Sequence, residues 1–127
     1  MKPASEKRIL NDSLVAVSAL PHTMAWRNNT GTAWQGEEVR AGVGTLVRVE
    51  SGMKILRNAR PISFGLPGSG DLLGVTRGRA WALEIKDTHG QQRDTQKKFQ
   101  AAFELAGGVY ALSRSVDFSR KIIEGLL

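Results

Sequence analysis

A chain of 127 residues is long enough for one domain with a buried core, so we predict a single domain over residues 1–127. Its 41% hydrophobic and 24% charged residues are ordinary for a globular protein, and the absence of cysteine excludes a disulfide framework, a thiolate zinc site and a cysteine nucleophile. The formal net charge of +6, from 18 Lys and Arg against 12 Asp and Glu, favours a polyanionic partner, although a solvated basic surface would give the same balance.

The first predicted element is a helix over residues 6–20. Ser5 is a suitable N-cap, and Pro21 ends the helix. Its apolar stripe is Leu10, Leu14 and Val17. A strand over residues 22–27 is expected next.

The middle of the chain has weaker signals. Residues 28–36 are polar and contain glycine, which is typical of a loop. Short strands are expected over residues 46–49, 54–57 and 62–64, with a turn at Ser51-Gly52.

The clearest element is a hairpin that follows a glycine-rich loop over residues 65–70. Residues 71–75 and 80–86 have the composition of strands, and Arg77-Gly78 can form the turn between them. Counting outward from that turn places Asp71 opposite Glu84. Opposed side chains share one face, with Cβ atoms about 4.5–5.5 Å apart. Alternation along the strand puts Lys86 on the same face as Glu84. The other face takes Trp81, Leu83 and Ile85.

The last third predicts a helix over residues 92–106, a short strand over 109–112 and a helix over 116–124. Gly107-Gly108 ends the first of these helices. Its inward side carries Phe99, Phe103 and Ala106, and the inward side of the last helix carries Phe118 and Ile122. The order of elements predicts an α/β fold with a mixed sheet flanked by helices.

The opposed carboxylates of Asp71 and Glu84 need a compensating positive charge. Lys86 alone could supply it, which would make a structural ion-pair cluster. The alternative is Mg²⁺ held by both carboxylates, waters and phosphate oxygens, with Lys86 orienting or deprotonating a metal-bound water. The residue pattern by itself leaves both readings open.

Glu6 and Gln96 lie on the core-facing sides of their predicted helices. Glu6 can oppose the helix dipole, and Gln96 can bond to backbone at the edge of the core. Each of these two residues could equally belong to the possible metal site.

At these residues the sequence resembles the VRR-Nuc (virus-type replication-repair nuclease) branch of the PD-(D/E)xK superfamily. The resemblance spans most of the chain between residues 26 and 112. Its matching parts are residues 26–31, 65–74, 83–86, Gln96 and 107–110. Where the family often has proline directly before the aspartate, this chain has Gly70.

The resemblance implies a restriction-endonuclease-like core and hydrolysis of DNA phosphodiester bonds with Mg²⁺, for which Mn²⁺ can substitute. Asp71 and Glu84 would bind the metal, helped by the backbone carbonyl of Ile85, and Lys86 would position or activate water. Glu6 would match a further acidic ligand, and Gln96 would support the site.

The resemblance also implies a homodimer that acts on branched DNA such as four-way junctions, as small viral and prophage members do. Arg27, Asn28 and Asn29 are candidates for contact with phosphate or for ordering the site, but they could also form a plain polar turn. The basic segment 32–60 is our candidate for the dimer contact and the DNA grip. Its cations are Arg40, Arg48, Lys54, Arg57 and Arg60, of which the last three are the predicted DNA contacts.

No stretch approaches the roughly 20 apolar residues of a membrane span, and the first residues lack the pattern of a signal peptide. We therefore expect no membrane partner and a cytoplasmic location, which would be the bacterial host cytoplasm for a viral or prophage protein. Two other functions stay open. One is a catalytically silent nucleic-acid-binding or dimerisation module with the same fold, and the other is a nuclease for flap, nicked or RNA substrates.

Overall fold

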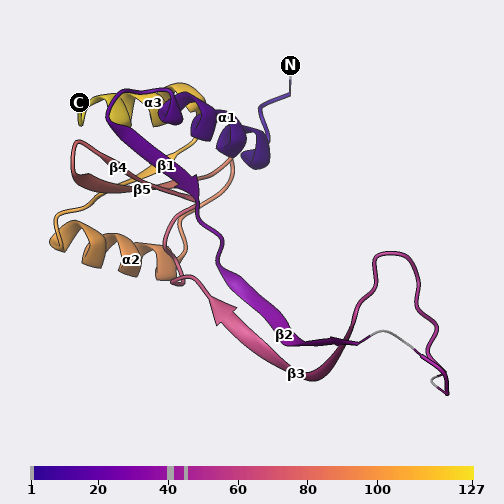
Figure 1. Cartoon of the computed structure of the whole chain (residues 1–127). Coiled ribbons are helices and arrows are strands. Elements are labelled where there is room, and N and C mark those ends of the chain that lie inside the picture. The colour runs from indigo at the N-terminus through magenta and orange to yellow at the C-terminus, as the bar shows by residue number, and fades with distance from the viewer. Residues whose placement is uncertain (1, 40–41, 45) are drawn as a thin grey trace. The chain divides into compact units, whose positions relative to one another are not determined.

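The computed structural model describes residues 2–39, 42–44 and 46–127, and the chain forms two compact units (Figure 1). Unit 1 comprises residues 1–30 and 65–127, and unit 2 comprises residues 31–64. The structure describes each unit separately, so it does not test the single domain that chain length predicts, and this domain count stays a prediction.

Unit 1 is built on a four-stranded sheet. In spatial order its strands are β1 (Thr23–Arg27), β4 (Leu72–Thr76), β5 (Arg79–Ile85) and β6 (Val109–Ser113). The β1–β4 and β4–β5 pairs are antiparallel and the β5–β6 pair is parallel, so the sheet is mixed. A parallel pair needs a crossover connection.

Three helices cover this sheet. The crossover between β5 and β6 contains α2 (Asp94–Leu105), which lies on one face. The opposite face is covered by α1 (Glu6–Ser18) and α3 (Val116–Glu124), as Figure 1 shows. The predicted mixed α/β fold with flanking helices is therefore confirmed, and its assignment to the PD-(D/E)xK core stays a prediction.

The β4–β5 hairpin has the predicted register. Arg77 and Gly78 both have left-handed backbone conformations, with φ of 48° and 78°, as a two-residue type I′ turn requires. The ladder runs from this turn to Leu72 opposite Leu83. One further step along both strands brings Asp71 and Glu84 across from each other.

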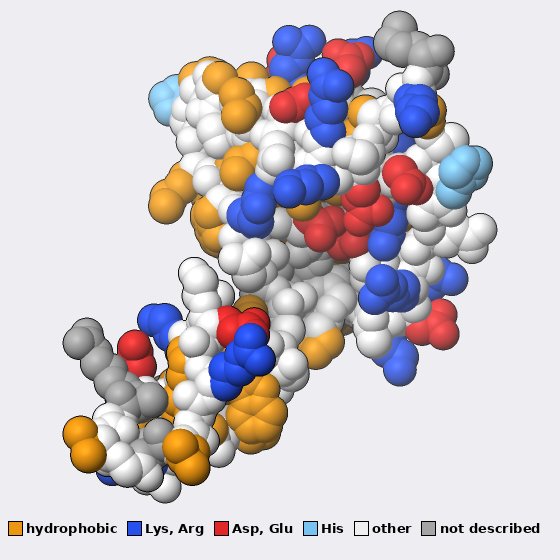
Figure 2. All heavy atoms as spheres, turned by 90° about the vertical axis from the view of Figure 1, so that its right-hand side faces the viewer, with side chains coloured by type: hydrophobic (Ala, Val, Ile, Leu, Met, Phe, Trp, Pro, Cys, Tyr) orange, Lys and Arg blue, Asp and Glu red, His pale blue; other side chains and the backbone are white. Residues whose placement is uncertain are grey.

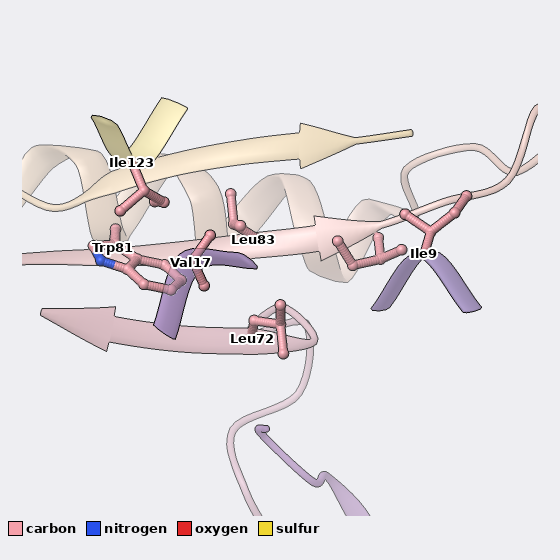
Figure 3. Packing of buried hydrophobic residues seen from close by; sticks show 7 residues of the cluster. Ile9, Val17, Leu72, Trp81, Leu83 and Ile123 are labelled. Carbon is pink, nitrogen blue, oxygen red and sulfur yellow. The ribbon is translucent and has the colours of Figure 1, made fainter. Parts of the chain in front are cut away.

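The core of unit 1 lies between the sheet and the α1–α3 layer (Figure 3). Trp81, Leu83 and Ile85 are buried in it, which confirms the predicted alternation along β5. Glu84 and Lys86 consequently point to the α2 side of the sheet.

The two outer helices keep their predicted bounds approximately, but their inward faces differ. Ser5 caps α1 as predicted, since its hydroxyl accepts the Arg8 N–H. The buried positions of α1 are Ile9, Ser13 and Val17, and Leu10 and Leu14 of the predicted stripe are partly buried and pack against the core. The prediction missed Ile9 and Ser13, whose hydroxyl donates to Ser119 of α3 over 3.0 Å.

Two residues that were predicted to face inward, one on α3 and one at the end of α2, are instead exposed. Phe118 of α3 is 44% exposed rather than inward, because Ser119 and Ile123 take the core positions. Ala106 is exposed, whereas Phe99 and Phe103 stack on each other with centroids 5.1 Å apart. No helix in the described parts of the chain is long and apolar enough to cross a membrane.

Unit 2 is a two-stranded antiparallel ribbon of β2 (Gly31–Val39) and β3 (Ile55–Phe64). The predicted loop over 28–36 is wrong from Gly31 onward, because pairing with β3 makes this polar stretch a strand. Residues 54–57 and 62–64 belong largely to one strand, residues 46–49 form no strand, and the turn at Ser51-Gly52 is confirmed. Arg40, named in the basic segment, lies outside the described residues.

Candidate active site

A polar cavity of about 210 Å³ lies in unit 1, where β4 begins and β5 ends. Six residues predicted from the sequence line it: Glu6, Asn28, Asp71, Glu84, Lys86 and Gln96. Figure 2 shows acidic side chains gathered on one face of the molecule, with Lys and Arg side chains around them. The fold thus brings together residues from α1, the end of β1, the β4–β5 hairpin and α2.

Asp71 is held at the entrance to β4 by backbone contacts with β5. Its N–H donates to the carbonyl of Leu83 over 2.8 Å, which continues the ladder by one bond. Its Oδ2 accepts the N–H of Ile85 over 2.7 Å. The carboxylate is therefore fixed beside Glu84 by the strand that carries Glu84.

Glu84 and Lys86 are both buried, with only 4% and 6% of their surfaces exposed. The Lys86 Nζ lies 3.3 Å from Oε1 of Glu84, and Gln96 Nε2 donates to the same oxygen over 2.6 Å. Buried charges require such partners, because desolvation is otherwise unfavourable. All three side chains share the α2 side of the sheet.

Burial and the neighbouring Asp71 carboxylate raise the pKa of Glu84 from its ordinary 4.5 to about 7, and the Lys86 ammonium opposes this rise only in part. Near neutral pH Glu84 therefore exchanges a proton, and a cation bound to its carboxylate would displace that proton.

The donor set fits Mg²⁺ or Mn²⁺. Among the residues that the structure describes, no three His, Cys, Asp or Glu side chains are grouped closely enough to hold an ion. Mg²⁺ needs only one or two carboxylates, because waters and substrate phosphate oxygens complete its shell. Asp71 and Glu84 would supply these carboxylates, and Glu6 lines the same cavity. The Ile85 N–H already bonds to Asp71, and the role of the Ile85 carbonyl as a ligand stays a prediction.

Asn28 is part of the site through contacts within the protein. Its Nδ2 lies 2.7 Å from the Ser69 hydroxyl, 3.1 Å from the Ser69 carbonyl and 2.9 Å from the Gly70 carbonyl. Its N–H donates to the carbonyl of Asp71 over 2.9 Å. Of the two roles predicted for it, these contacts favour ordering the site over gripping phosphate.

The neighbouring predictions have different outcomes. Arg27 lies on the surface and donates to the side chain of Asn11, and Asn29 is exposed. Neither lines the cavity. Lys54, Arg57 and Arg60 all belong to unit 2, and their contact with DNA stays a prediction.

Four further residues line the cavity and were not predicted from the sequence: Thr30, Ser69, Arg93 and Thr95. The glycine-rich loop is the sequence feature that could have indicated some of them. Gly68 has a φ of +81°, and a Cβ there would lie 2.3 Å from the carbonyl of Thr95. The loop therefore packs directly on the start of α2, which carries Gln96.

No protein-family model matches the chain, and no curated protein matches it.

Proposed function

We propose that the chain is a divalent-metal-dependent endonuclease that hydrolyses phosphodiester bonds in DNA, with branched DNA such as four-way junctions as its preferred substrate. One observation carries this proposal. Asp71, Glu84 and Lys86 meet in one polar cavity, and Glu84 keeps a raised pKa although the Lys86 ammonium lies beside it. Perturbed groups that converge in a cavity are typical of catalytic sites. The resemblance to VRR-Nuc nucleases supports the same assignment, with this core as a member of the PD-(D/E)xK fold.

Each residue has a defined task in this proposal. Asp71 and Glu84 bind the cation, and Mg²⁺, or Mn²⁺ in its place, stabilises charge on the phosphoryl oxygens and the leaving group when bound. Gln96 holds the Glu84 carboxylate in place through Oε1. Lys86 lies within reach of the same oxygen and orients the attacking water or holds its proton. A homodimer would present two such sites to opposed strands of a junction.

The experiment is cleavage of labelled four-way junction, flap, nicked duplex, single-stranded DNA and RNA, each with Mg²⁺ and with a chelator. We expect metal-dependent cleavage that is fastest on the junction. Asp71→Asn and Lys86→Met should abolish cleavage while DNA binding survives. Asp117→Asn serves as the matched control, because within the described residues this carboxylate pairs with surface cations of α3 alone. Another preferred substrate would correct the substrate class, and absence of all metal-dependent cleavage would reject the enzyme.

A catalytically silent nucleic-acid-binding or dimerisation module is the second candidate. The observation in its favour is that Lys86 and Gln96 both contact the Glu84 carboxylate within the protein. Such a cluster can be structural. In that case Lys86→Met would destabilise the fold, and the wild-type protein would bind DNA with no dependence on Mg²⁺.

A further inference from the structure

The β2–β3 ribbon of unit 2 contains a bulge that changes which side chains share a face. Gln35 pairs with Arg60, but Glu37, two residues on, pairs with Arg57, which is three residues back. The extra residue lies on β3, where Asn58 has a left-handed φ of 53°. Opposed residues share a face, so the bulge puts both arginines on the face of Gln35 and Glu37. Without it, residues three apart on a strand would point to opposite faces.

We call this side the bulge face, defined by Gln35, Glu37, Arg57 and Arg60. Together with Gly36 and Asn58, these residues line a hollow of about 350 Å³ in unit 2. Gly36 is required by the close packing, because a Cβ there would lie 2.9 Å from the carbonyl oxygen of Arg57.

The two arginines of the bulge face differ from the other described cations of unit 2. Lys54 pairs with Glu38 and Arg48 pairs with Glu50. Within the described part of the chain, Arg57 has no carboxylate within ion-pair distance. Arg60 donates from Nε and Nη2 to the neutral Oε1 of Gln35 over 3.2 and 2.9 Å.

This arrangement holds the Arg60 guanidinium in a position from which it can bind phosphate oxygens. The bonds to Gln35 fix the Arg60 guanidinium, yet leave three of its five N–H donors available. Arginine binds phosphate oxygens with paired N–H donors, and a fixed guanidinium loses less entropy on binding. Among the described residues that line the hollow, Glu37, opposite Arg57, is the only acidic one.

We propose that the bulge face is a docking surface for the phosphate backbone of duplex DNA. A two-stranded ribbon fits the width of the major groove, and its face cations can then reach the flanking phosphates. The proposal names the DNA contact of the proposed nuclease and in that sense rests on it, but the binding can be measured without cleavage.

The test is fluorescence anisotropy with a short labelled DNA duplex in the presence of a chelator, over a range of salt concentrations. Arg57→Gln/Arg60→Gln should weaken binding about tenfold and lower the slope of log affinity against log salt by about 1 to 2. Arg120→Gln/Lys121→Gln removes the same charge from ion-paired sites on α3 and should change both quantities much less. Equal losses in the two double variants would overturn the bulge-face assignment.

A second pair of variants keeps the charge constant. Gly36→Ala forces the bulge to move while both arginines remain, so it should also weaken binding. Gly42→Ala is the control, because no described atom beyond the adjacent residues lies within 4 Å of a Cβ at that position. Glu37→Gln should tighten binding, since it removes the one negative charge from the hollow. Unchanged affinity in Gly36→Ala and Glu37→Gln would contradict the proposal.

The outcomes separate this proposal from the nuclease itself. If the wild-type protein binds duplex DNA through Arg57 and Arg60 but never cleaves, the docking surface stands and the nuclease fails. If it cleaves while the double variant binds normally, the docking surface fails. If sedimentation shows that the double variant changes self-association and leaves DNA binding intact, the bulge face serves a second copy and the proposal is overturned.

Discussion

Gln96 connects the start of α2 to the Glu84 carboxylate with both ends of one amide. Its Nε2 donates to Oε1 of Glu84 over 2.6 Å, and its own Oε1 accepts the N–H of Arg93 over 2.8 Å. The second bond satisfies the N-cap residue of the helix. The position of α2 and the orientation of Glu84 therefore depend on the same side chain.

Gln96→Met keeps the length of the side chain and removes both bonds, so we expect it to lower the free energy of unfolding by about 1–3 kcal/mol. It should also raise the pKa of Glu84 further, because the ionised carboxylate loses a donor. Urea unfolding and carbon NMR of the carboxyl group measure the two effects. Gln100→Met is the control, since that amide bonds to Gln92 and Glu104 and does not line the cavity. Similar losses in both variants would contradict the special role of Gln96.

The raised pKa of Glu84 makes stability depend on pH. Between about pH 4.5 and 7 the folded protein holds a proton that the unfolded chain releases, so the free energy of unfolding falls as pH rises through this window. A shift of this size corresponds to at most about 3 kcal/mol, with the cost fully present above pH 7. Urea unfolding in chelator, compared with Glu84→Gln at each pH, isolates this contribution. A difference between the two proteins that does not change with pH would show that Glu84 has an ordinary pKa.

Binding of a cation should be coupled to the same proton. Mn²⁺ bound by Asp71 and Glu84 would expel the proton from Glu84, so calorimetry in buffers of different ionisation enthalpy should detect more protons released at about pH 6 than at about pH 8. Asp71→Asn should remove the binding heat, and Asp117→Asn should not. No heat in the wild-type protein at either pH would favour the structural ion-pair cluster instead.

The parts of the site that are local in sequence were predictable. The turn at Arg77-Gly78 sets the hairpin register, and the register sets the Asp71–Glu84 pair, so short-range rules were enough. The burial of Ser13 on α1 was not predictable, because its hydroxyl partner Ser119 is 106 residues away in the sequence. For the same reason β2 was missed, since its polar residues form a strand only by pairing with β3.

Asn28 and Asn29 offer a matched test of how the loop before Asp71 is fixed. Asn28→Ala removes the donor shared by the Ser69 and Gly70 oxygens, and we expect a loss of about 1–3 kcal/mol in unfolding free energy. It should also weaken Mn²⁺ binding, because Asp71 follows this loop directly. Asn29→Ala changes an exposed side chain and should leave both quantities within error. If Asn28→Ala weakens only DNA binding, its role is contact with phosphate after all.

Gly74 tests the packing on which the β4–β5 hairpin depends. It pairs with Trp81, and a Cβ at Gly74 would lie 2.1 Å from the indole ring and 2.7 Å from the carbonyl oxygen of Met24. The ring cannot move away easily, because Trp81 is 1% exposed and its Nε1 donates to the hydroxyl of Thr76 over 3.0 Å. Gly74→Ala should therefore cost about 1–3 kcal/mol by overpacking, toward the upper end because backbone is one of the obstacles. Thermal unfolding followed by tryptophan fluorescence measures this loss, with Gly42→Ala as a substitution into open space. If both variants unfold at the wild-type temperature, the indole does not lie over Gly74, and the face assigned to β5 would have to be revised together with the placement of Glu84 and Lys86.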